Sequence, residues 1–443
     1  MLYRVIIANY RSFGEEQEFN MFPNMRRDNF THHIYHTKSL PVLKETAIYG
    51  ANGSGKSNFV KALALIDRFA TEVPSRDKLW LKNWYLENRF RLPVFEGNQP
   101  AGILVEFGVE GTVYIYNVEI GMDGVTIENL YLSGKGKGDH TSIFSRSANN
   151  VTFEAANVSE DVRKIFIRQI TDNPSASILA LNGTLHLSDD DNMSKAYKWF
   201  KDSLSVISVD RQIPWLIEQL KDQTDVLEFV NHIFTEVGLG ISHMDINTCQ
   251  FDEWINKTND NERNILNNLL NNNGVPNQTV SKMGSEVPMY SISTENGERM
   301  VREFIFNQIG RNGYSGVMNA SAQSAGTLRL LSLVPALYYA MKFENTIVID
   351  EIDNGIHPIL IKQLVKYFGN SDTKGQLIFT THETPLLNQQ KLLRADEVWF
   401  TEKKSGETQM YSLNDFKYHK SLSIENGYLD GRFGAIPFLG ALE

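Results

Sequence analysis

A glycine-rich segment near the N-terminus has the residue types and spacing that bind a phosphate. Residues 50–57 fit the pattern G-x-x-x-x-G-K-[ST], with Gly55, Lys56 and Ser57 at its end. Such a loop turns backbone N–H groups toward phosphate oxygens. We expect Lys56 to reach the β and γ phosphates of ATP and the Ser57 hydroxyl to hold Mg²⁺. The expected nucleotide contacts are Gly50, Asn52, Gly53, Ser54, Gly55, Lys56, Ser57 and Asn58.

A second set of reactive residues follows two β-branched runs near the C-terminus. Residues 346–349 are Thr-Ile-Val-Ile, typical of a buried parallel strand, and Asp350 and Glu351 come directly after them. We expect Asp350 to hold Mg²⁺ through water and Glu351 to act on the water that attacks the phosphate. The second run, residues 377–381, precedes His382, which we expect to hydrogen-bond the γ phosphate or the water. Taken alone, each set also fits an ordinary surface turn.

The elements around these residues predict how they come together. Residues 46–49 are expected to form a strand before the glycine loop. A helix is expected from Lys56 onward, because apolar residues recur there at helical spacing: Phe59, Leu63, Ile66 and Ala70. This order of strand, loop and helix disfavours a glycine turn without a ligand.

The rest of the chain predicts an α/β protein in three parts. Residues 2–7 are expected to form a strand, and alternation within 101–132 predicts an antiparallel meander. The residue pattern of 155–305 predicts helices, and it includes an asparagine-rich stretch at 256–273. A helix for contacts with partners is expected there, around Leu266, Leu269 and Leu270. The expected domains are 1–135, the N-terminal half of the nucleotide-binding core; 136–310, an inserted helical subdomain; and 311–443, the C-terminal half of the core.

Together, these motifs resemble the head of an ABC-type ATPase. Walker A would be 50–57, Walker B 346–351 and the H-loop His382. The resemblance implies a P-loop ATPase head with an antiparallel β subdomain and an inserted helical domain. The bound cofactors would be ATP and Mg²⁺, and the reaction would be Mg²⁺-dependent hydrolysis of ATP. No convincing glutamine-loop residue is found, since Gln99 and Glu128 match poorly.

The segment Ser324-Ala325-Gly326-Thr327 resembles the signature of standalone ABC-type ATPases related to SMC, Rad-fifty, RecF and OLD proteins. The resemblance implies that Ser324 and Gly326 contact the γ phosphate bound by an opposite protomer. The protein would then form a homodimer or a higher homo-oligomer. Ser324 also fits a helix N-cap, and the two roles are compatible. The opening Asn9-Tyr10-Arg11 resembles that of the same ATPases and implies that Arg11 lies near the nucleotide.

The C-terminal segment 428–437 resembles the tail of AAA family ATPases from bacterial anti-phage defence systems, such as the AriA-type ATPases of PARIS. This resemblance implies an ATP-driven switch that controls a separate effector protein, such as a nuclease, and answers to a phage-encoded trigger. A RecF-like or Rad-fifty-like ATPase that binds DNA directly for repair or maintenance stays an alternative. A self-contained nuclease and a transporter subunit are disfavoured, the latter by the signature sequence.

Composition limits the possible classes of protein. The 443 residues are 42% hydrophobic and 22% charged, which is ordinary globular composition, and they predict about two or three domains. The formal net charge of −10 excludes a basic coat but not a local basic groove. The single cysteine, Cys249, excludes an intrachain disulfide and suits a cytoplasmic protein. No apolar run of 18 residues predicts a membrane span.

Two other clusters have spacings that suggest chemistry. His32, His33 and His36 could bind a metal, but no carboxylate pattern supports them, so we expect a polar loop. Residues 402–404, Glu-Lys-Lys, match the E-x-K of some nucleases, with Asp396 nearby. Such short matches are common by chance.

Two further groups fit structural roles better than chemical ones. Residues 189–191 are three aspartates, which fit a solvated helix start better than an acidic nuclease cluster. Tyr197, Trp199 and Phe200 are expected to pack in the core rather than to stack on nucleic-acid bases.

Overall fold

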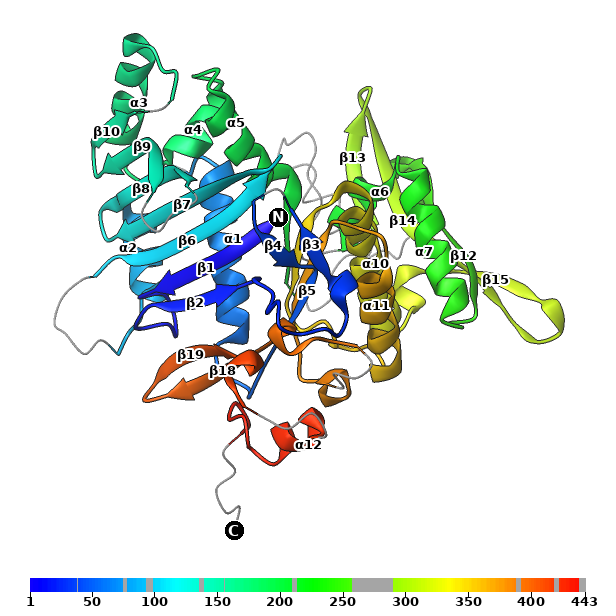
Figure 1. Ribbon diagram of the computed structural model, residues 1–443. Helices are drawn as coiled ribbons and strands as arrows, with labels where there is room; N and C mark the ends of the chain where they lie inside the picture. Colours follow the sequence, from blue (N-terminus) through cyan, green and yellow to red (C-terminus); the bar gives the residue numbers. More distant parts are fainter. Residues whose placement is uncertain are drawn as a thin grey trace. The chain divides into compact units, whose positions relative to one another are not determined.

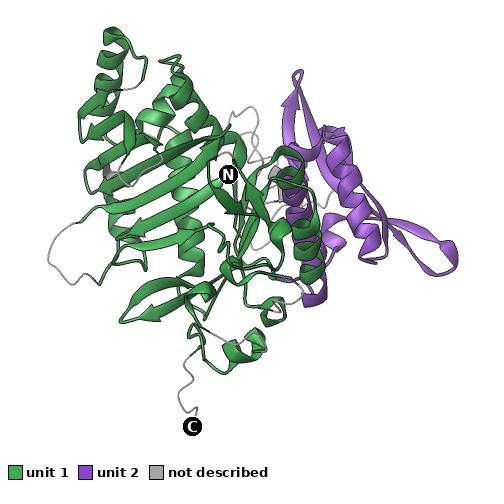
Figure 2. Ribbon diagram, in the orientation of Figure 1, with its two compact units in different colours: residues 1–208, 339–353, 361–443 green, residues 209–338, 354–360 purple. Residues whose placement is uncertain are grey.

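The computed structural model describes residues 1–37, 39–74, 78–92, 99–134, 139–154, 156–208, 213–256, 290–387, 392–417 and 422–437. The chain divides into two compact units (Figure 2). The first unit contains residues 1–208, 339–353 and 361–443, and the second contains residues 209–338 and 354–360. Both ends of the chain therefore belong to the same unit.

A mostly parallel sheet forms the centre of the first unit (Figure 1). Its strands in spatial order are β11 (Leu204–Ile207), β16 (Thr346–Ile349), β17 (Gln376–Thr380), β5 (Glu45–Gly50), β18 (Val398–Lys404) and β19 (Glu407–Ser412). Strand β5 pairs in parallel with β17 and β18, and β17 pairs in parallel with β16. The carboxyl ends of β5, β16 and β17 therefore meet at one edge of the sheet, where ligands bind in open α/β folds.

The second sheet of this unit is antiparallel. Its strands in spatial order are β10 (Asn150–Phe153), β9 (His140–Ser147), β8 (Gly124–Ser133), β7 (Thr112–Gly121), β6 (Ala101–Val109), β1 (Leu2–Ala8) and β2 (Gln17–Asn20). The strand expected at 2–7 and the meander expected within 101–132 are confirmed. A short hairpin is formed by β3 (Ile34–His36) and β4 (Pro41–Leu43).

Helix α1 (Lys56–Thr71) begins at the expected residue and buries its apolar stripe in the core. Phe59 of α1 packs on Phe19 of β2, with ring centroids 4.9 Å apart. The helix that follows the glycine loop is thus held against the antiparallel sheet. The other helices within this unit are α2 (Lys78–Asn88), α3 (Glu160–Asp172), α4 (Ile178–Leu185), α5 (Asp191–Lys198) and α12 (Ile424–Leu429).

The second unit has an antiparallel sheet of its own. Its strands are β12 (Ile241–Gln250), β14 (Glu298–Ile309), β13 (Tyr290–Glu295) and β15 (Ser315–Asn319), and its helices are α6 (Ile213–Leu220), α7 (Thr224–Glu236) and α8 (Phe251–Ile255). Helices α10 (Ala325–Phe343) and α11 (Pro358–Asn370) each have residues in both units.

The expectation that residues 136–310 are a helical subdomain is wrong in part. Strands β9 and β10 extend the antiparallel sheet beyond residue 135, and β11 is an edge strand of the parallel sheet. The segment also contains β12, β13 and β14. Cross-strand pairing with distant residues produced these strands, and local periodicity does not record such pairing. The helix expected around Leu266, Leu269 and Leu270 lies outside the described residues.

Glu128, one poor match for a glutamine loop, has a structural role. Its buried carboxylate accepts hydrogen bonds from the N–H groups of Ile178 and Leu179 at 2.8 and 3.2 Å, at the start of α4. The Tyr116 hydroxyl donates to it at 3.0 Å, and Arg146 lies 3.4 Å away. Burial raises the pKa of Glu128, and Arg146 opposes the rise. This carboxylate joins helix α4 to the antiparallel sheet.

The aspartates at 189–191 and the aromatic residues after them have the expected structural roles. The Asp190 carboxylate caps α5, because it accepts a hydrogen bond from the Met193 N–H at 2.9 Å. Trp199 is buried and stacks on Phe107, with ring centroids 4.2 Å apart. Phe200 is also buried, and its ring makes an edge contact with the Phe107 ring.

Candidate functional site

The glycine loop joins β5 to α1 and needs its glycines. Gly53 and Gly55 have φ angles of 77° and 119°, which glycine adopts without steric cost. A Cβ on Gly55 would collide with the Thr408 side chain of β19. A Cβ on Gly50 would collide with Thr401 of β18. The loop is therefore held tightly against the β18–β19 hairpin, which comes from the other end of the chain.

At least four backbone N–H groups of the loop and the helix start are available to a ligand. None donates a hydrogen bond to a residue that the structure describes: Gly53, Gly55, Lys56 and Ser57. The first N–H groups of a helix have no acceptor within the helix. With the positive end of the helix dipole, such groups favour an anionic ligand. The Ser54 N–H differs, because it donates to the Ala51 carbonyl at 3.1 Å.

Lys56 is folded back onto the loop. Its Nζ donates hydrogen bonds to the carbonyls of Gly50 and Ala51 at 2.7 and 3.2 Å, and the side chain is buried. Burial lowers the pKa of Lys56 to about 8, although the charges of Glu351 and Asp350 oppose this change. A phosphate at the loop would supply the negative charge that this cation lacks.

Asp350, directly after β16, is hydrogen-bonded to the first turn of α1. Its Oδ1 accepts a hydrogen bond from Ser57 Oγ at 3.2 Å and another from Thr380 Oγ1 at 2.7 Å. Neighbouring oxygen ligands of octahedral Mg²⁺ are about 2.9 Å apart, given bonds of about 2.0–2.1 Å. The Ser57–Asp350 separation therefore fits two oxygens that hold one Mg²⁺, directly or through its water shell.

Thr380 positions the turn that carries both carboxylates, and the sequence-based reasoning missed it. The N–H of Glu351 donates to Thr380 Oγ1 at 2.7 Å, and the N–H of Ile352 donates to the Thr380 carbonyl at 3.1 Å. Glu351 has a φ of 47°, unusual for a residue with a side chain. The available signal was a hydroxyl residue at the end of a β-branched run beside the acidic strand.

His382 follows β17 at the same edge of the sheet as the glycine loop. Partial burial lowers the pKa of His382, and the Lys56 charge lowers it further. The side chain is largely exposed to solvent, which screens this effect. His382 is therefore favoured in its neutral form, which has one donor and one acceptor nitrogen.

The side chains of Asn58 and Ser54 bind protein groups. Asn58 Nδ2 donates to Ser12 Oγ at 2.7 Å, and the Ser12 and Thr408 hydroxyls are hydrogen-bonded at 2.7 Å. Ser54 Oγ is hydrogen-bonded to the Thr401 hydroxyl at 2.7 Å. These side chains hold the loop in place. Ser12, Thr401 and Thr408 carry no motif, so sequence analysis could not identify them.

Two other residues expected at the site, Arg11 and Asn52, lie in turns. Arg11 has a φ of 52°, and its Nε donates to the Tyr10 hydroxyl at 3.1 Å. Asn52 lies at the exposed tip of the glycine loop. Asn58, hydrogen-bonded to Ser12, connects the turn that contains Arg11 to the first turn of α1.

The signature segment begins α10. Ser324 Oγ accepts a hydrogen bond from the Thr327 N–H at 3.1 Å, so its N-cap role is confirmed. A Cβ on Gly326 would lie 2.6 Å from the Gly355 carbonyl oxygen. Gly326 thus permits close contact between the signature and the loop after Walker B. Both glycines belong to the second unit, whereas Walker A belongs to the first.

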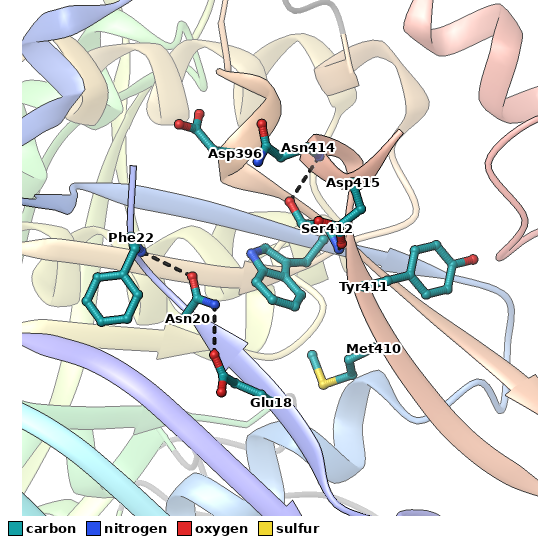
Figure 3. A pocket seen from close by; sticks show the side chains of 10 residues that line it. Glu18, Asn20, Phe22, Asp396, Met410, Tyr411, Ser412, Asn414 and Asp415 are labelled. Atoms are coloured by element: carbon teal, nitrogen blue, oxygen red, sulfur yellow. Dashed lines mark hydrogen bonds between the residues drawn. The ribbon is translucent and has the colours of Figure 1, made fainter. Parts of the chain in front are cut away.

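A nuclease centre at residues 402–404 has no support in the structure. Both carboxylate oxygens of Asp396 bind the buried Arg394 guanidinium, at 2.8 and 2.9 Å. Asp396 also lines a cavity of about 270 Å³ (Figure 3). Its lining includes Glu18, Asp396 and Asp415 but no residue of the glycine loop. The carboxylates of this lining do not favour a phosphate there.

No helix among the described residues is both long and apolar enough to cross a membrane.

Comparisons with known proteins place the chain in a family. Residues 46–388 match the family described as "AAA domain, putative AbiEii toxin, Type IV TA system". Among solved structures, an SMC head bound to the C-winged helix domain of ScpA is 13% identical, with a TM-score of 0.43 and coverage of 97% of this chain and 99% of that chain. The SMC head domain from Thermotoga maritima is also 13% identical, with a TM-score of 0.40 and coverage of 93% and 98%. Curated proteins give no match. Because the family match runs from β5 past His382, the chain belongs to this AAA family of P-loop ATPases.

Proposed function

We propose that the chain binds Mg²⁺–ATP at the glycine loop and hydrolyses it as a molecular switch. The observation that carries this proposal is the contact between Ser57 and Asp350 beside four uncommitted N–H groups and Lys56. The N–H groups and Lys56 would neutralise the phosphates, and the two oxygens would hold Mg²⁺. Glu351 would orient the attacking water, with His382 beside the γ phosphate. Catalysis would then consist of positioning and charge stabilisation.

Two variants test whether Lys56 serves ATP binding and Glu351 serves hydrolysis. Lys56→Ala should lose most of its affinity for ATP, because the loop loses its phosphate-binding cation. Glu351→Gln should bind ATP with near-normal affinity and hydrolyse it slowly, because only the step that uses water is damaged. Nucleotide binding and phosphate release are measured for both variants. Glu344→Gln is the matched control, since Glu344 is exposed and forms an ion pair with Lys374 at the surface. Normal turnover by Glu351→Gln would remove Glu351 from the mechanism.

The proposed switch works between two copies of the chain. Ser324 and Gly326 of one protomer would contact the γ phosphate held by the other. Neither Lys56→Ala nor Ser324→Arg should then hydrolyse ATP alone, and mixing them should restore part of the activity at composite sites. Subunit exchange is confirmed by tagging the two variants differently. No recovery after confirmed exchange would contradict a signature that acts across an interface.

An apolar hairpin in the second unit supports a role in association. At the β14–β15 turn, Ile309, Tyr314 and Val317 are 60%, 78% and 65% exposed. Large apolar side chains gathered on one exposed hairpin favour a protein interface. The double variant Tyr314→Ser and Val317→Ser should weaken self-association or binding of the effector. Unchanged oligomer mass and effector retention would exclude this hairpin as an interface.

The biological role that we propose is control of a separate effector in anti-phage defence. The family description, which names a putative toxin of a type IV toxin–antitoxin system, supports an abortive-infection setting. Cells that carry the wild-type gene with its neighbours should resist phage, and Glu351→Gln should change that resistance. Tight, salt-sensitive binding of duplex DNA by the purified protein would favour a DNA-maintenance role instead.

A further inference from the structure

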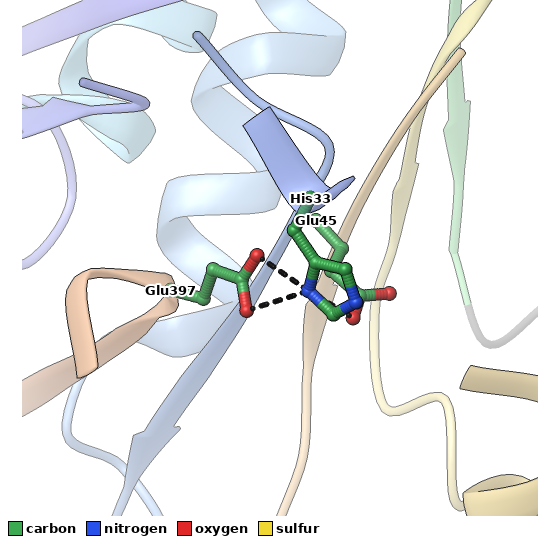
Figure 4. A group of neighbouring side chains, drawn as sticks. All are labelled: His33, Glu45 and Glu397. Carbon is green, nitrogen blue, oxygen red and sulfur yellow. Dashed lines mark hydrogen bonds and ion pairs between the residues drawn. The ribbon is translucent and has the colours of Figure 1, made fainter. Parts of the chain in front are cut away.

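The His33 ring lies beside two carboxylates, those of Glu45 and Glu397 (Figure 4). Its exposed fraction is 2%, and Glu45 and Glu397 are fully buried. The expectation of a polar loop without supporting carboxylates is therefore wrong for His33. Glu45 begins β5, and Glu397 ends the turn before β18, 364 residues from His33 in the sequence. Only the fold brings these three groups together.

The ligand atoms have the spacing of a metal site. His33 Nδ1 lies 2.9 Å from Glu397 Oε1 and 3.5 Å from Glu45 Oε1. One ligand atom from each of the three residues lies within 4.8 Å of the other two. Ligands of tetrahedral Zn²⁺ are roughly 3.3 Å apart, given bonds of about 2.0–2.1 Å. A small adjustment of side chains would therefore accommodate one ion.

Glu45 is the second observation that favours a ligand. Neither of its carboxylate oxygens has a hydrogen-bond partner among the described residues, although the side chain is fully buried. A buried carboxylate without partners is costly unless a proton or a cation neutralises it. Burial raises the pKa of Glu45, and the Glu397 charge raises it further. The Lys44 charge opposes this rise, but Lys44 Nζ donates a hydrogen bond to the Ser371 carbonyl at 2.9 Å and none to Glu45 among the described residues.

The backbone of Gly369 forms one wall of the cluster. Gly369 of α11 lies against Glu45 and His33, and a Cβ there would lie 2.8 Å from Glu45 Oε1 and 2.9 Å from His33 Nε2. A larger residue at position 369 would collide with both side chains. The Arg394 guanidinium is bound to Asp396, so it does not neutralise the cluster. The cluster thus has two carboxylates and one imidazole, and the Lys44 charge acts on both carboxylates without a hydrogen bond to either among the described residues.

We propose that His33, Glu45 and Glu397 bind one divalent transition-metal cation, such as Zn²⁺ or Mn²⁺. The imidazole nitrogen favours these ions over Mg²⁺, which prefers oxygen ligands and keeps several waters. The ion would join the 31–36 segment to the start of β5 and the end of the 395–397 turn. Because β5 leads into the glycine loop, the ion would stabilise the strand on which the proposed nucleotide site is built.

Binding of the ion requires a proton to leave. His33 Nδ1 shares a hydrogen bond with Glu397 in the present arrangement, and a ligand nitrogen must carry its lone pair toward the metal. The proton on that bond would pass to solvent as the metal binds. Release of protons on metal addition is therefore part of the expected result.

The full-length protein is expressed with added Zn²⁺ and Mn²⁺ and passed over a chelating resin. Its metal content is then measured by mass spectrometry. We expect about one ion per chain in the wild type and loss of that ion in Glu45→Gln and His33→Ala. The matched control is His32→Ala, since His32 is the exposed neighbour that hydrogen-bonds Asn370. Asp350→Asn should also keep the ion, which separates this site from the proposed Mg²⁺ site.

A second measurement uses the wild type alone, so it still tests the proposal if the variants fail to fold. The wild type is unfolded in chelator and refolded with Co²⁺, which reports histidine and carboxylate ligands through its visible absorption. We expect one equivalent of Co²⁺ to bind with proton release, and Zn²⁺ to displace it and raise the melting temperature. A folded wild type that holds no metal after either procedure would overturn the proposal and leave the cluster bridged by a proton. Equal metal content in wild type and a folded Glu45→Gln would also overturn it.

Discussion

The Thr380 hydroxyl connects the two strands that carry the proposed catalytic groups, so its removal should affect stability and activity together. Thr380→Val keeps the shape of the side chain but deletes the donor to Asp350 Oδ1 and the acceptor of the Glu351 N–H, each at 2.7 Å. A hydrogen bond to a charged group contributes about 1.5–3 kcal/mol, and an unpaired N–H costs about 1–3 kcal/mol when fully buried. Because Glu351 is half-buried, water offsets part of the second cost. We expect a loss of about 2–4 kcal/mol in the free energy of unfolding.

The same change should slow turnover, because Asp350 and Glu351 lose the group that orients them. Loss of a residue that orients a metal ligand typically costs 10–100-fold in activity or affinity, so we expect ATP turnover to fall by about that factor. Urea unfolding followed by circular dichroism gives the stability, and phosphate release gives the turnover. Thr381→Val is the matched control, because Thr381 is equally buried and its hydroxyl accepts a hydrogen bond from the Glu383 N–H at 3.0 Å rather than contacting either carboxylate of the Walker B turn among the described residues. If both variants lose the same stability and keep the same turnover, the positioning role of Thr380 is wrong.

Three further changes test other features of the structure. ATP affinity should fall roughly fivefold between pH 8 and pH 9, because only the protonated Lys56 binds phosphate and its pKa is lowered to about 8. Lys56→Arg stays charged over this range, so its ATP affinity should not change with pH in the same titration. Gly326→Ala should lower the free energy of unfolding by about 1–3 kcal/mol, because its Cβ would press on the Gly355 carbonyl. The loss should appear as a lower midpoint of urea unfolding, and an unchanged midpoint would show that the contact relaxes freely. Glu128→Ala should lower the free energy of unfolding by about 3–5 kcal/mol, because the buried Arg146 would lose its carboxylate partner. Thermal unfolding monitored by circular dichroism measures this loss.

The motifs of the chain were sufficient to predict the strand, loop and helix of the nucleotide site. The pattern at 50–57, the β-branched run at 346–349 and the run at 377–381 each correspond to the expected element. These predictions succeed because glycine conformations, helix periodicity and buried strand composition are local properties. The α/β class follows from the same local signals.

Other features depended on contacts between residues far apart in the sequence. Strand β11 lies in a segment whose sequence pattern predicts helices, and it forms because Leu204–Ile207 pairs with β16. The Thr380 contact with Asp350 forms only because β17 lies beside β16. His33, Glu45 and Glu397 offered no spacing that sequence analysis could use. The amino-acid sequence by itself determined which residues can bind phosphate and where the local elements begin. The tertiary structure decided which buried charges meet, because strand pairing and burial act between segments that the sequence keeps hundreds of residues apart.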